Sequence, residues 1–289
     1  MNTDILVVGG TGLLGREIVR LANPVYTYFH TQPQAPNAFH LDVRNHTASR
    51  KLLEHINPKN IVFCSGMTDV DGCEVNPELA YAINTHSLIP FIEYSNQKDA
   101  FLVVISTDYV FEGAQGNYKE SDEKYPVNIY GKSKSLAENL IFSSGISYAI
   151  VRTSVIFGRE EASGKKNFVL WLYENLRKGK SVNALVDNVV SPTYNVYLAK
   201  AILEIVERRL TGVWHIASRK GISRYEMACK VKEFFGLPGE VIAAKMEQMN
   251  WKAKRPANSS LDVSKALEYL KQKPATFEEW LREMGWLDA

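Results

Sequence analysis

The sequence predicts an α/β protein built on a doubly wound parallel sheet. Short runs of β-branched and other apolar residues alternate with helix-like segments through the first half of the 289-residue chain. The runs at residues 5–8 and 101–105 are apolar at every position, which is typical of strands buried on both faces. A glycine-rich turn directly follows the first run. Strands that are joined by helical crossovers form a parallel sheet with helices on both of its faces.

The expected strands of this sheet follow one another at short intervals. They cover residues 5–8, 25–29, 39–41, 61–64, 101–105 and 148–151. Helices are expected over residues 12–21, 47–56 and 133–142, and from about residue 77 onward. Leu14, Ile18 and Leu21 share one face of the first helix, and Pro58 ends the second. Apart from the strands at 25–29 and 39–41, which follow each other directly, strands and helices alternate.

Beyond about residue 155 the alternation becomes less regular. Helices are expected over residues 167–177, 194–207 and 277–284, with a short strand at 213–216. Ser223 is a suitable N-cap for a further helix that ends at Phe235, before Gly236 and Pro238. We therefore expect a first domain over residues 1–155 and a smaller C-terminal α/β lobe formed mainly by residues 156–289, with elements interleaving across an approximate boundary.

Composition and charge favour a globular cytoplasmic protein. The chain is 45% hydrophobic, and 34 basic against 32 acidic residues give a net charge of +2 without any basic run, which argues against nucleic-acid binding. No apolar stretch approaches the roughly 18 residues of a membrane helix, and the first residues lack the basic segment of a signal peptide. Cys64, Cys73 and Cys229 have no metal-ligand spacing and are expected as reduced thiols. No metal site is assigned.

The glycine-rich turn predicts a site for a dinucleotide cofactor. Gly9, Gly12 and Gly15 follow the first strand and open the first helix. Such a turn lets the backbone approach a pyrophosphate at the positively polarised N-terminus of a helix. A tight turn without a ligand is the alternative, but the strand before and the helix after favour a Rossmann-type cofactor site. The expected cofactor-binding residues of this turn are Gly9, Thr11, Gly12, Leu13, Leu14 and Gly15.

The end of the second strand bears on the choice between NADP and NAD. A carboxylate at this place would hold the ribose 2′-hydroxyl of NAD. The chain reads Phe29-His30-Thr31-Gln32 here, without an acid, which favours NADP. His30 is a candidate for contact with the 2′-phosphate. No arginine is present in this stretch, so NAD remains open.

A tyrosine and a lysine four residues apart predict a site for hydride transfer. Tyr130 and Lys134 would share one face of a helix, where the ammonium lowers the pKa of the phenol so that it can exchange a proton with a substrate oxygen. The same spacing occurs at residues 94 and 98 and at residues 269 and 273, so spacing alone is weak evidence. Tyr130, however, follows the strand at 101–105, after which Thr107 offers a hydroxyl. Ligands of open α/β sheets bind at this carboxyl end.

Four motifs give the chain a resemblance that extends over essentially its whole length. They are STDYVFEG at residues 106–113, PVNIYGKSK at 126–134, VSPT at 190–193 and RPANSSLD at 255–262. With the glycine turn, they resemble the extended short-chain dehydrogenase/reductase superfamily, and within it the dTDP-4-dehydrorhamnose reductase group. The last motif is the most specific of the four.

The resemblance implies a reaction and a set of site residues. NADPH would reduce the C4 ketone of a dTDP-4-keto-6-deoxy sugar, converting dTDP-4-dehydrorhamnose to dTDP-L-rhamnose. Tyr130 would protonate the new alkoxide, Lys134 would tune Tyr130 and hold the nicotinamide ribose, and Thr107 would position the carbonyl. By match to the family, Asp42 and Val43 would lie near the adenine, Ser65, Gly66, Met67 and Thr68 along the cofactor, and Thr107, Asp108, Val155 and Arg255 at the substrate.

Two departures from the family pattern concern the pocket. Val155 stands where reductases of the group often carry a tryptophan that would pack on the sugar, and Met67 replaces a commoner aromatic residue. The first departure leaves the identity of the sugar open.

Two alternatives to a reductase remain. A nucleotide-sugar epimerase would use the same Tyr130 and Lys134 with a retained NAD, whereas a dehydratase is disfavoured because Tyr109 stands where an acid is needed. The regulatory β subunit of methionine adenosyltransferase also resembles this chain, including residues 224–229. Such a protein would bind NADP and a partner chain without turnover. For the reductase the expected partners are a nucleotide-sugar substrate and a second copy of the chain in a homodimer.

Overall fold

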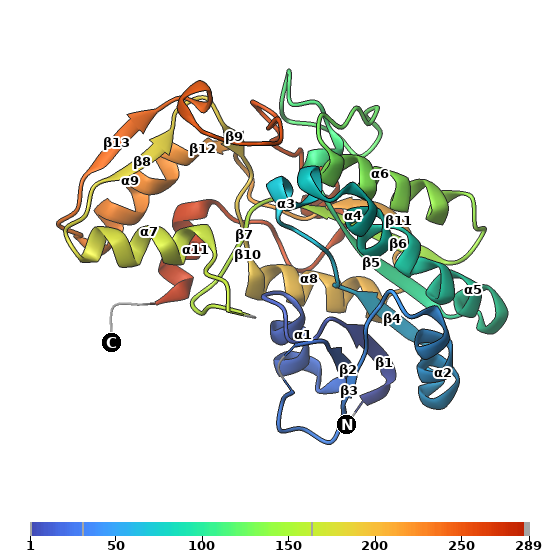
Figure 1. The fold of residues 1–289 in the computed structure, drawn as a ribbon. Coiled ribbons are helices and arrows are strands. Elements are labelled where there is room, and N and C mark those ends of the chain that lie inside the picture. Colours follow the sequence, from blue (N-terminus) through green and yellow to red (C-terminus); the bar gives the residue numbers. More distant parts are fainter. Residues whose placement is uncertain (1, 31, 163, 286–289) are drawn as a thin grey trace.

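A seven-stranded parallel sheet forms the centre of the molecule (Figure 1). The computed structural model describes residues 2–30, 32–162 and 164–285. The strand order is β11-β6-β5-β4-β1-β2-β3, and every neighbouring pair is parallel. The strands are β1 (Asn2–Val8), β2 (Pro24–Tyr28), β3 (Ala38–His40), β4 (Asn60–Phe63), β5 (Phe101–Thr107), β6 (Tyr148–Thr153) and β11 (Gly212–His215). The predicted doubly wound α/β fold is thereby confirmed.

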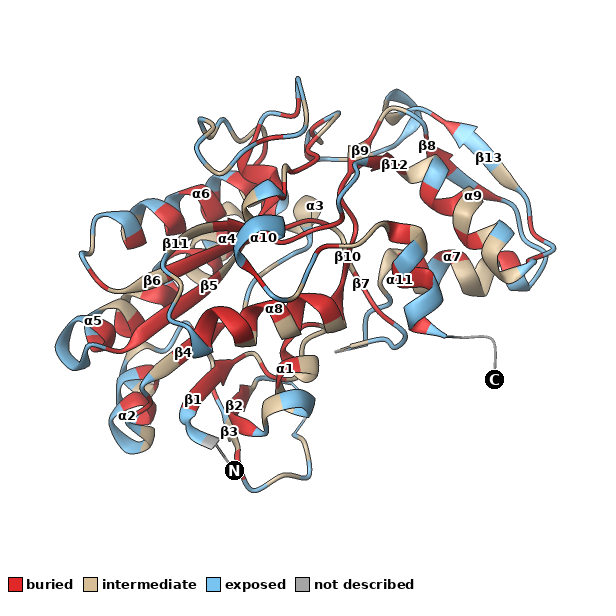
Figure 2. Ribbon diagram, turned by 180° about the vertical axis from the view of Figure 1, so that it is seen from behind, coloured by how far each residue is buried: buried red, intermediate tan, exposed pale blue. Residues whose placement is uncertain are grey.

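Helices cover both faces of this sheet, because successive side chains of each strand point to opposite faces. Ile5 and Val7 of β1 pack with helices α1 (Gly15–Ala22) and α8 (Asn195–Glu207). Leu6 and Val8 pack with α2 (His46–Ile56), α5 (Ile89–Lys98) and α6 (Ile129–Phe142) on the other face. Figure 2 shows the central strands and α8 as largely buried. Continuous apolar runs in the sequence follow from this double coverage.

Helix α6 begins four residues before the expected start at residue 133. Asn128 is its N-cap, and the Asn128 side chain accepts a hydrogen bond of 2.8 Å from the backbone N–H of Gly131. The first turn of α6 therefore contains Tyr130. Strand β5 extends two residues beyond the expected strand and ends at Thr107.

The second half of the chain contributes to the sheet and also forms a separate lobe. Strand β11 pairs with β6, and α8 packs on α1, so both elements lie beyond residue 155 yet belong to the sheet domain. The remaining lobe contains α7 (Phe168–Arg177), α9 (Arg224–Phe235) and α11 (Phe277–Met284), beside the parallel pair β8 (Val182–Leu185) and β13 (Val241–Ala244). Phe157, Leu172 and Trp280 of this lobe belong to the same apolar cluster as Val7.

Short elements connect these parts. They are α3 (Val70–Val75), α4 (Pro77–Asn84), α10 (Ser264–Tyr269), β7 (Ile156–Phe157), β9 (Val189–Val190), β10 (Thr193–Tyr194) and β12 (Ile222–Ser223), with 3₁₀ turns at His86–Leu88, Asp108–Val110 (η2) and Met246–Gln248. No helix in the described ranges is long and apolar enough to cross a bilayer.

A buried ion pair fastens α6 to the sheet. Glu138 of α6 and Arg152 of β6 have side chains that are 1% and 2% exposed, and they approach to 2.8 Å. Glu138 also accepts a hydrogen bond of 2.6 Å from the Ser106 hydroxyl and lies 3.1 Å from the ammonium of Lys124. Burial by itself raises the pKa of Glu138, but the hydrogen bonds and positive charges of these partners bring it below its ordinary value.

Replacing Glu138 with Ala should lower the free energy of unfolding at pH 7 by about 3–5 kcal/mol, because Arg152 would remain buried without a counter-charge. Since the pKa of Glu138 is lowered in the folded protein, this loss should shrink as the pH falls through the ordinary value of 4.5 and below. Urea unfolding at several pH values measures both effects.

The matched control is Glu93→Ala, which removes the partner of Arg50 in a pair whose side chains are 45% and 46% exposed. This change should cost less than about 1 kcal/mol. Equal losses from the two variants would contradict the role given to the buried pair.

Candidate active site

Three predicted catalytic residues lie at the carboxyl edge of the sheet. Thr107 ends β5, is 5% exposed and shares a hydrogen bond with the phenol of Tyr130. Lys134 follows Tyr130 by four residues on α6 and is 6% exposed. The ring of Tyr109 meets the ring of Tyr130 edge to face at 5.9 Å. The structure thus brings a hydroxyl, a phenol and an ammonium to one edge of the sheet, two of them on one helix.

Burial controls the protonation of this cluster. It raises the pKa of Tyr130, while the hydrogen bond with Thr107 acts in the opposite direction. Burial also lowers the pKa of Lys134 to about 8. The negative charge of Glu138, one turn further along α6, acts to raise this pKa but does not outweigh burial. The phenol is therefore protonated at neutral pH, which is the form that donates a proton to an oxygen.

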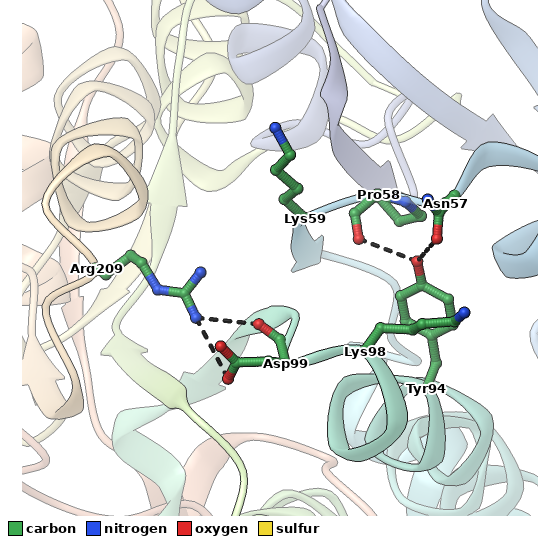
Figure 3. Close-up of a pocket in the computed structure, with 7 residues that line it drawn as sticks. All are labelled: Asn57, Pro58, Lys59, Tyr94, Lys98, Asp99 and Arg209. Atoms are coloured by element: carbon green, nitrogen blue, oxygen red, sulfur yellow. Dashed lines mark hydrogen bonds and ion pairs between the residues drawn. The ribbon is translucent and has the colours of Figure 1, made fainter.

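The second Tyr–Lys pair of the sequence lies at the opposite edge of the sheet, near the residues that precede β4 and β5. Figure 3 shows the surroundings of this pair. The Tyr94 hydroxyl donates to the side chain of Asn57 at 3.1 Å and to the carbonyl of Pro58 at 3.2 Å. Lys98 lies beside it in an open hollow of about 400 Å³, close to the residues that precede β4 and β5. Parallel α/β sheets bind ligands at the carboxyl edge, so this hollow is not the catalytic site.

The glycine turn has the geometry that a pyrophosphate requires. Gly9 has φ +88°, and a Cβ at Gly15 would lie 2.2 Å from the Gly9 carbonyl oxygen, so both positions require glycine. A Cβ at Gly12 would find that same oxygen at 3.4 Å and nothing nearer, which leaves this side of the turn accessible. The N-cap of α1, Leu14, provides no side-chain hydrogen bond to the first turn. The backbone N–H groups of Leu13, Leu14 and Gly15 donate no hydrogen bond to the described residues, and such groups at the start of a helix suit an anionic ligand.

Two buried asparagines that the sequence analysis missed hold the cofactor segments in place. Asn84 is 1% exposed, accepts from the Met67 N–H at 2.7 Å and donates to the Ser133 hydroxyl at 3.0 Å, which links the loop at 65–68 to α6. Asn195 donates to the carbonyl of Leu13 in the glycine turn at 3.2 Å. Its Oδ1 is buried without a hydrogen-bond partner in the described residues. Neither asparagine belongs to a sequence motif that would have revealed it.

An arginine that the sequence analysis also missed lies beside Asp42, where the adenine is expected. Arg44 binds Asp42 through two guanidinium nitrogens, with Nε 2.9 Å from Oδ1, and this hydrogen bonding lowers the pKa of Asp42. The Arg44 guanidinium also lies 5.9 Å from the ring centre of Phe29, which contacts the rings of His30 and His40. The end of β2 therefore has an arginine beside it, supplied by the segment after β3. Val43, next to Asp42, is buried.

The expected substrate residues differ in their surroundings. Arg255 pairs with Asp71 of α3 at 3.1 Å and stacks on Trp251 with its guanidinium 4.9 Å from the ring centre. Val155 has φ +40°, which is rare for a β-branched residue and is held by hydrogen bonds from Thr193 to the carbonyls of residues 154 and 155. Asp108 is 2% exposed, and its carboxylate accepts hydrogen bonds from three protein hydroxyls.

Metal binding receives no support from the described part of the chain. Within residues 2–30, 32–162 and 164–285, no three His, Cys, Asp or Glu side chains gather as ligands for an ion.

Fold and cluster together define the class: a Rossmann-type oxidoreductase with a Tyr–Lys pair at the carboxyl edge of its sheet. The model of the RmlD substrate binding domain family matches residues 2–287, and the chain belongs to this family. The expected kinship with dTDP-4-dehydrorhamnose reductases is confirmed.

Three similar proteins illustrate the relationship. The crystal structure of a hypothetical dTDP-4-dehydrorhamnose reductase from Sulfolobus tokodaii has a TM-score of 0.86 and 37% identity, covering 96% of this chain and 97% of that one. The Bacillus anthracis dTDP-4-dehydrorhamnose reductase in complex with NADP has a TM-score of 0.86 and 27% identity, covering 98% and 99%. Methionine adenosyltransferase 2 subunit beta of Danio rerio is 29% identical, covering 98% of this chain and 90% of its own length.

Replacing Lys134 with Met should raise the free energy of unfolding at pH 7 by about 1 kcal/mol, because the buried ammonium is costly in the folded protein. The pKa of Lys134, about 8, lies below the ordinary 10.5, so below pH 8 the buried ammonium destabilises the folded protein by its full amount. It should fade as the pH rises through the interval between these two values. Denaturant unfolding across this pH range is the measurement.

Lys132→Met is the matched control, since Lys132 lies on the same helix with its side chain exposed. It should show no such gain. A Lys134→Met protein that is less stable than the parent at pH 7 would disprove the assignment.

Proposed function

We propose that the protein is an NADPH-dependent reductase that converts the C4 ketone of dTDP-4-dehydrorhamnose to the hydroxyl of dTDP-L-rhamnose. The observation that carries this proposal is the cluster of Thr107, Tyr130 and Lys134 at the carboxyl edge of the sheet. Support also comes from the family membership and from the NADP complex of the Bacillus anthracis relative.

The cofactor fits the segments that line this edge. NADPH supplies the hydride when it is bound. The N–H groups at the start of α1 would hold its pyrophosphate, and Asn195 keeps the Leu13 carbonyl of that turn in position. The cofactor would be flanked by the loop of Ser65, Gly66, Met67 and Thr68. Asn84 holds this loop by accepting a hydrogen bond from the Met67 N–H.

Proton transfer depends on residues of this chain alone. Tyr130 would donate its phenolic proton to the oxygen on C4 as negative charge develops there. The ammonium of Lys134 would stabilise the phenolate that remains. Thr107, whose hydroxyl is hydrogen-bonded to the phenol, would set the position of both the phenol and the ketone. Second-half segments outside the sheet would form most of the sugar pocket.

A second candidate is an NADP-binding regulatory subunit of a methionine adenosyltransferase complex. The near full-length match to the Danio rerio subunit favours it. Such a subunit would need the cofactor segments but no proton donor. An epimerase fits less well, because it would begin with Tyr130 as a base while burial raises the pKa of this phenol. A homodimer and a cytoplasmic location stay predictions.

Replacing Tyr130 with Phe should lower kcat for NADPH oxidation with dTDP-4-keto-6-deoxy-L-lyxo-hexulose by about 10²–10⁴-fold, since the proton donor is lost. NADPH affinity, measured by fluorescence, should stay within about threefold because pyrophosphate contacts supply most of it. Tyr94→Phe, at the opposite edge of the sheet, is the matched control and should retain the parental rate.

The parent protein itself distinguishes the two candidates. Tight NADPH binding without turnover would overturn the reductase proposal and favour the regulatory subunit. Release of oxidised cofactor into solution during turnover would exclude an epimerase that retains NAD.

Arg44→Ala should weaken NADPH binding by about tenfold and leave NADH binding unchanged, because only NADPH has a 2′-phosphate for a guanidinium to bind. Isothermal titration with each cofactor measures this preference. Arg50→Ala, which removes an exposed arginine of α2, is the control and should change neither affinity. Equal losses for the two cofactors would refute a 2′-phosphate contact.

A further inference from the structure

Asp108 occupies an unusual place beside the catalytic cluster. It follows Thr107 directly, begins η2 and is 2% exposed. Oδ1 accepts a hydrogen bond of 3.0 Å from the Thr107 hydroxyl. Oδ2 accepts hydrogen bonds of 2.7 Å from the hydroxyl of Ser154 and 2.5 Å from that of Ser259. Among the described residues no Lys or Arg forms an ion pair with this carboxylate, so three hydroxyls satisfy it.

These bonds occupy most of the acceptor sites of the carboxylate. An ionised carboxylate has only acceptor sites, and three of them are used inside the protein. Its buried side chain is turned toward hydroxyls of the protein rather than toward solvent. The expectation that Asp108 touches the substrate therefore finds no support in this arrangement.

The bond to Oδ1 determines what the Thr107 hydroxyl can do. This hydroxyl has one proton, which it donates to Asp108. Its oxygen is then left to accept, and it accepts from the Tyr109 N–H at 3.2 Å. The hydrogen bond with Tyr130 lowers the pKa of the phenol, which is the effect of a hydroxyl that donates to the phenolate, so Asp108 and Tyr130 compete for the single proton of Thr107. Asp108 thus holds the Thr107 hydroxyl in place beside the phenol.

The bonds to Oδ2 connect Asp108 to the rest of the pocket. Ser154 follows β6 and immediately precedes the strained Val155. Ser259 belongs to the segment 255–262, is fully buried and lies 151 residues from Asp108 in the sequence. Lys254, directly before this segment, is held by Asn128, the N-cap of α6, whose side chain donates to the Lys254 carbonyl at 2.8 Å. The carboxylate is therefore the point at which β5, β6 and the C-terminal segment meet.

We propose that Asp108 is a positioning residue whose buried carboxylate, held by Ser154 and Ser259, fixes the Thr107 hydroxyl beside the phenol of Tyr130. This role rests on the reductase function proposed above. In this arrangement the Ser259 hydroxyl of the C-terminal segment helps to assemble the catalytic cluster, because it holds Asp108. Substrate contacts are left to other residues of the pocket.

The electrostatics agree with this geometry. The negative charge of Asp108 raises the pKa of Tyr130, as do Cys73 of α3 and Tyr109 of η2, while burial has the largest effect. Burial raises the pKa of Asp108 itself, and the positive charge of Arg224 on α9 acts to lower it. Removing the carboxylate charge should therefore let the phenol ionise at lower pH.

Asp108→Asn tests the proposal, because an amide of the same shape has one acceptor oxygen and cannot accept from all three hydroxyls. We expect kcat for NADPH oxidation to fall about 10- to 100-fold, with KM and the NADPH dissociation constant within about threefold of the parent. The alkaline limb of the pH–kcat profile should move to lower pH. Asp99→Asn, whose side chain is 91% exposed at the opposite edge of the sheet, should leave all four quantities unchanged.

Ser259→Ala provides a second variant if Asp108→Asn does not fold. It keeps the carboxylate charge and the bond to Thr107 but loosens the anchor, so kcat should fall about three- to tenfold with an unchanged KM. A raised KM at parental kcat in either variant would make Asp108 part of substrate binding and overturn the proposal. Parental kcat and pH profile in a folded Asp108→Asn protein would overturn it as well.

Failure of the reductase function itself is distinguishable. If the parent shows no turnover, NMR of labelled tyrosine, assigned with Tyr130→Phe, still follows the ionisation of Tyr130. The phenolate should then appear at lower pH in Asp108→Asn than in the parent. Identical titrations would overturn the positioning role, whatever reaction the protein catalyses.

Discussion

The arrangement of the active site depends on how Glu138 holds helix α6 against the sheet. Tyr130, Lys134 and Glu138 are spaced four residues apart, so they lie along one side of α6. Glu138 is bonded to Ser106 of β5 and Arg152 of β6, the two strands whose ends line the site. Because this carboxylate is saturated and buried, α6 can neither rotate nor slide without breaking an ion pair in a dry interior. The interaction that stabilises the fold therefore also sets the distance from Tyr130 to Thr107.

The network around Glu138 extends into the second half of the chain. His215 of β11 is fully buried, with Nε2 3.4 Å from Nη1 of Arg152. Burial, together with the charge of Arg152, lowers the pKa of His215 to about 3, so the imidazole is neutral and can accept from the guanidinium. Glu120 accepts a hydrogen bond of 3.0 Å from the backbone N–H of His215. A strand from beyond residue 200 thus supports the catalytic helix, which explains why the sheet domain cannot end near residue 155.

The sequence predicted those features whose causes are local. Apolar runs gave the strands, the Ser223 cap gave α9, and the glycine turn gave the start of α1, since each depends on neighbouring residues. Contacts between distant residues could not be read in this way: Asn195 reaches Leu13 across 182 positions. Arg44 was missed because the sequence analysis considered only the end of β2 for a 2′-phosphate contact. Strand β3 pairs with β2, so the segment after β3 places Arg44 beside Phe29 at that end. Asp108 was recognised, but its hydroxyl partners depend on tertiary folding.

Three features of the carboxyl edge oppose stability, and their common location is informative. Lys134 and Asp108 are ionisable groups whose charged forms are disfavoured by burial. Val155 has a left-handed backbone that costs about 1–2 kcal/mol for a residue with a Cβ. Thr193 and the Asp108–Ser154 bond hold the chain on both sides of Val155, so the strain cannot relax. Packing alone would favour neutral side chains and a relaxed turn here. Their persistence within a few residues of Thr107 and Tyr130 is best explained by a requirement for exact placement of catalytic groups, which is where folded proteins retain strain.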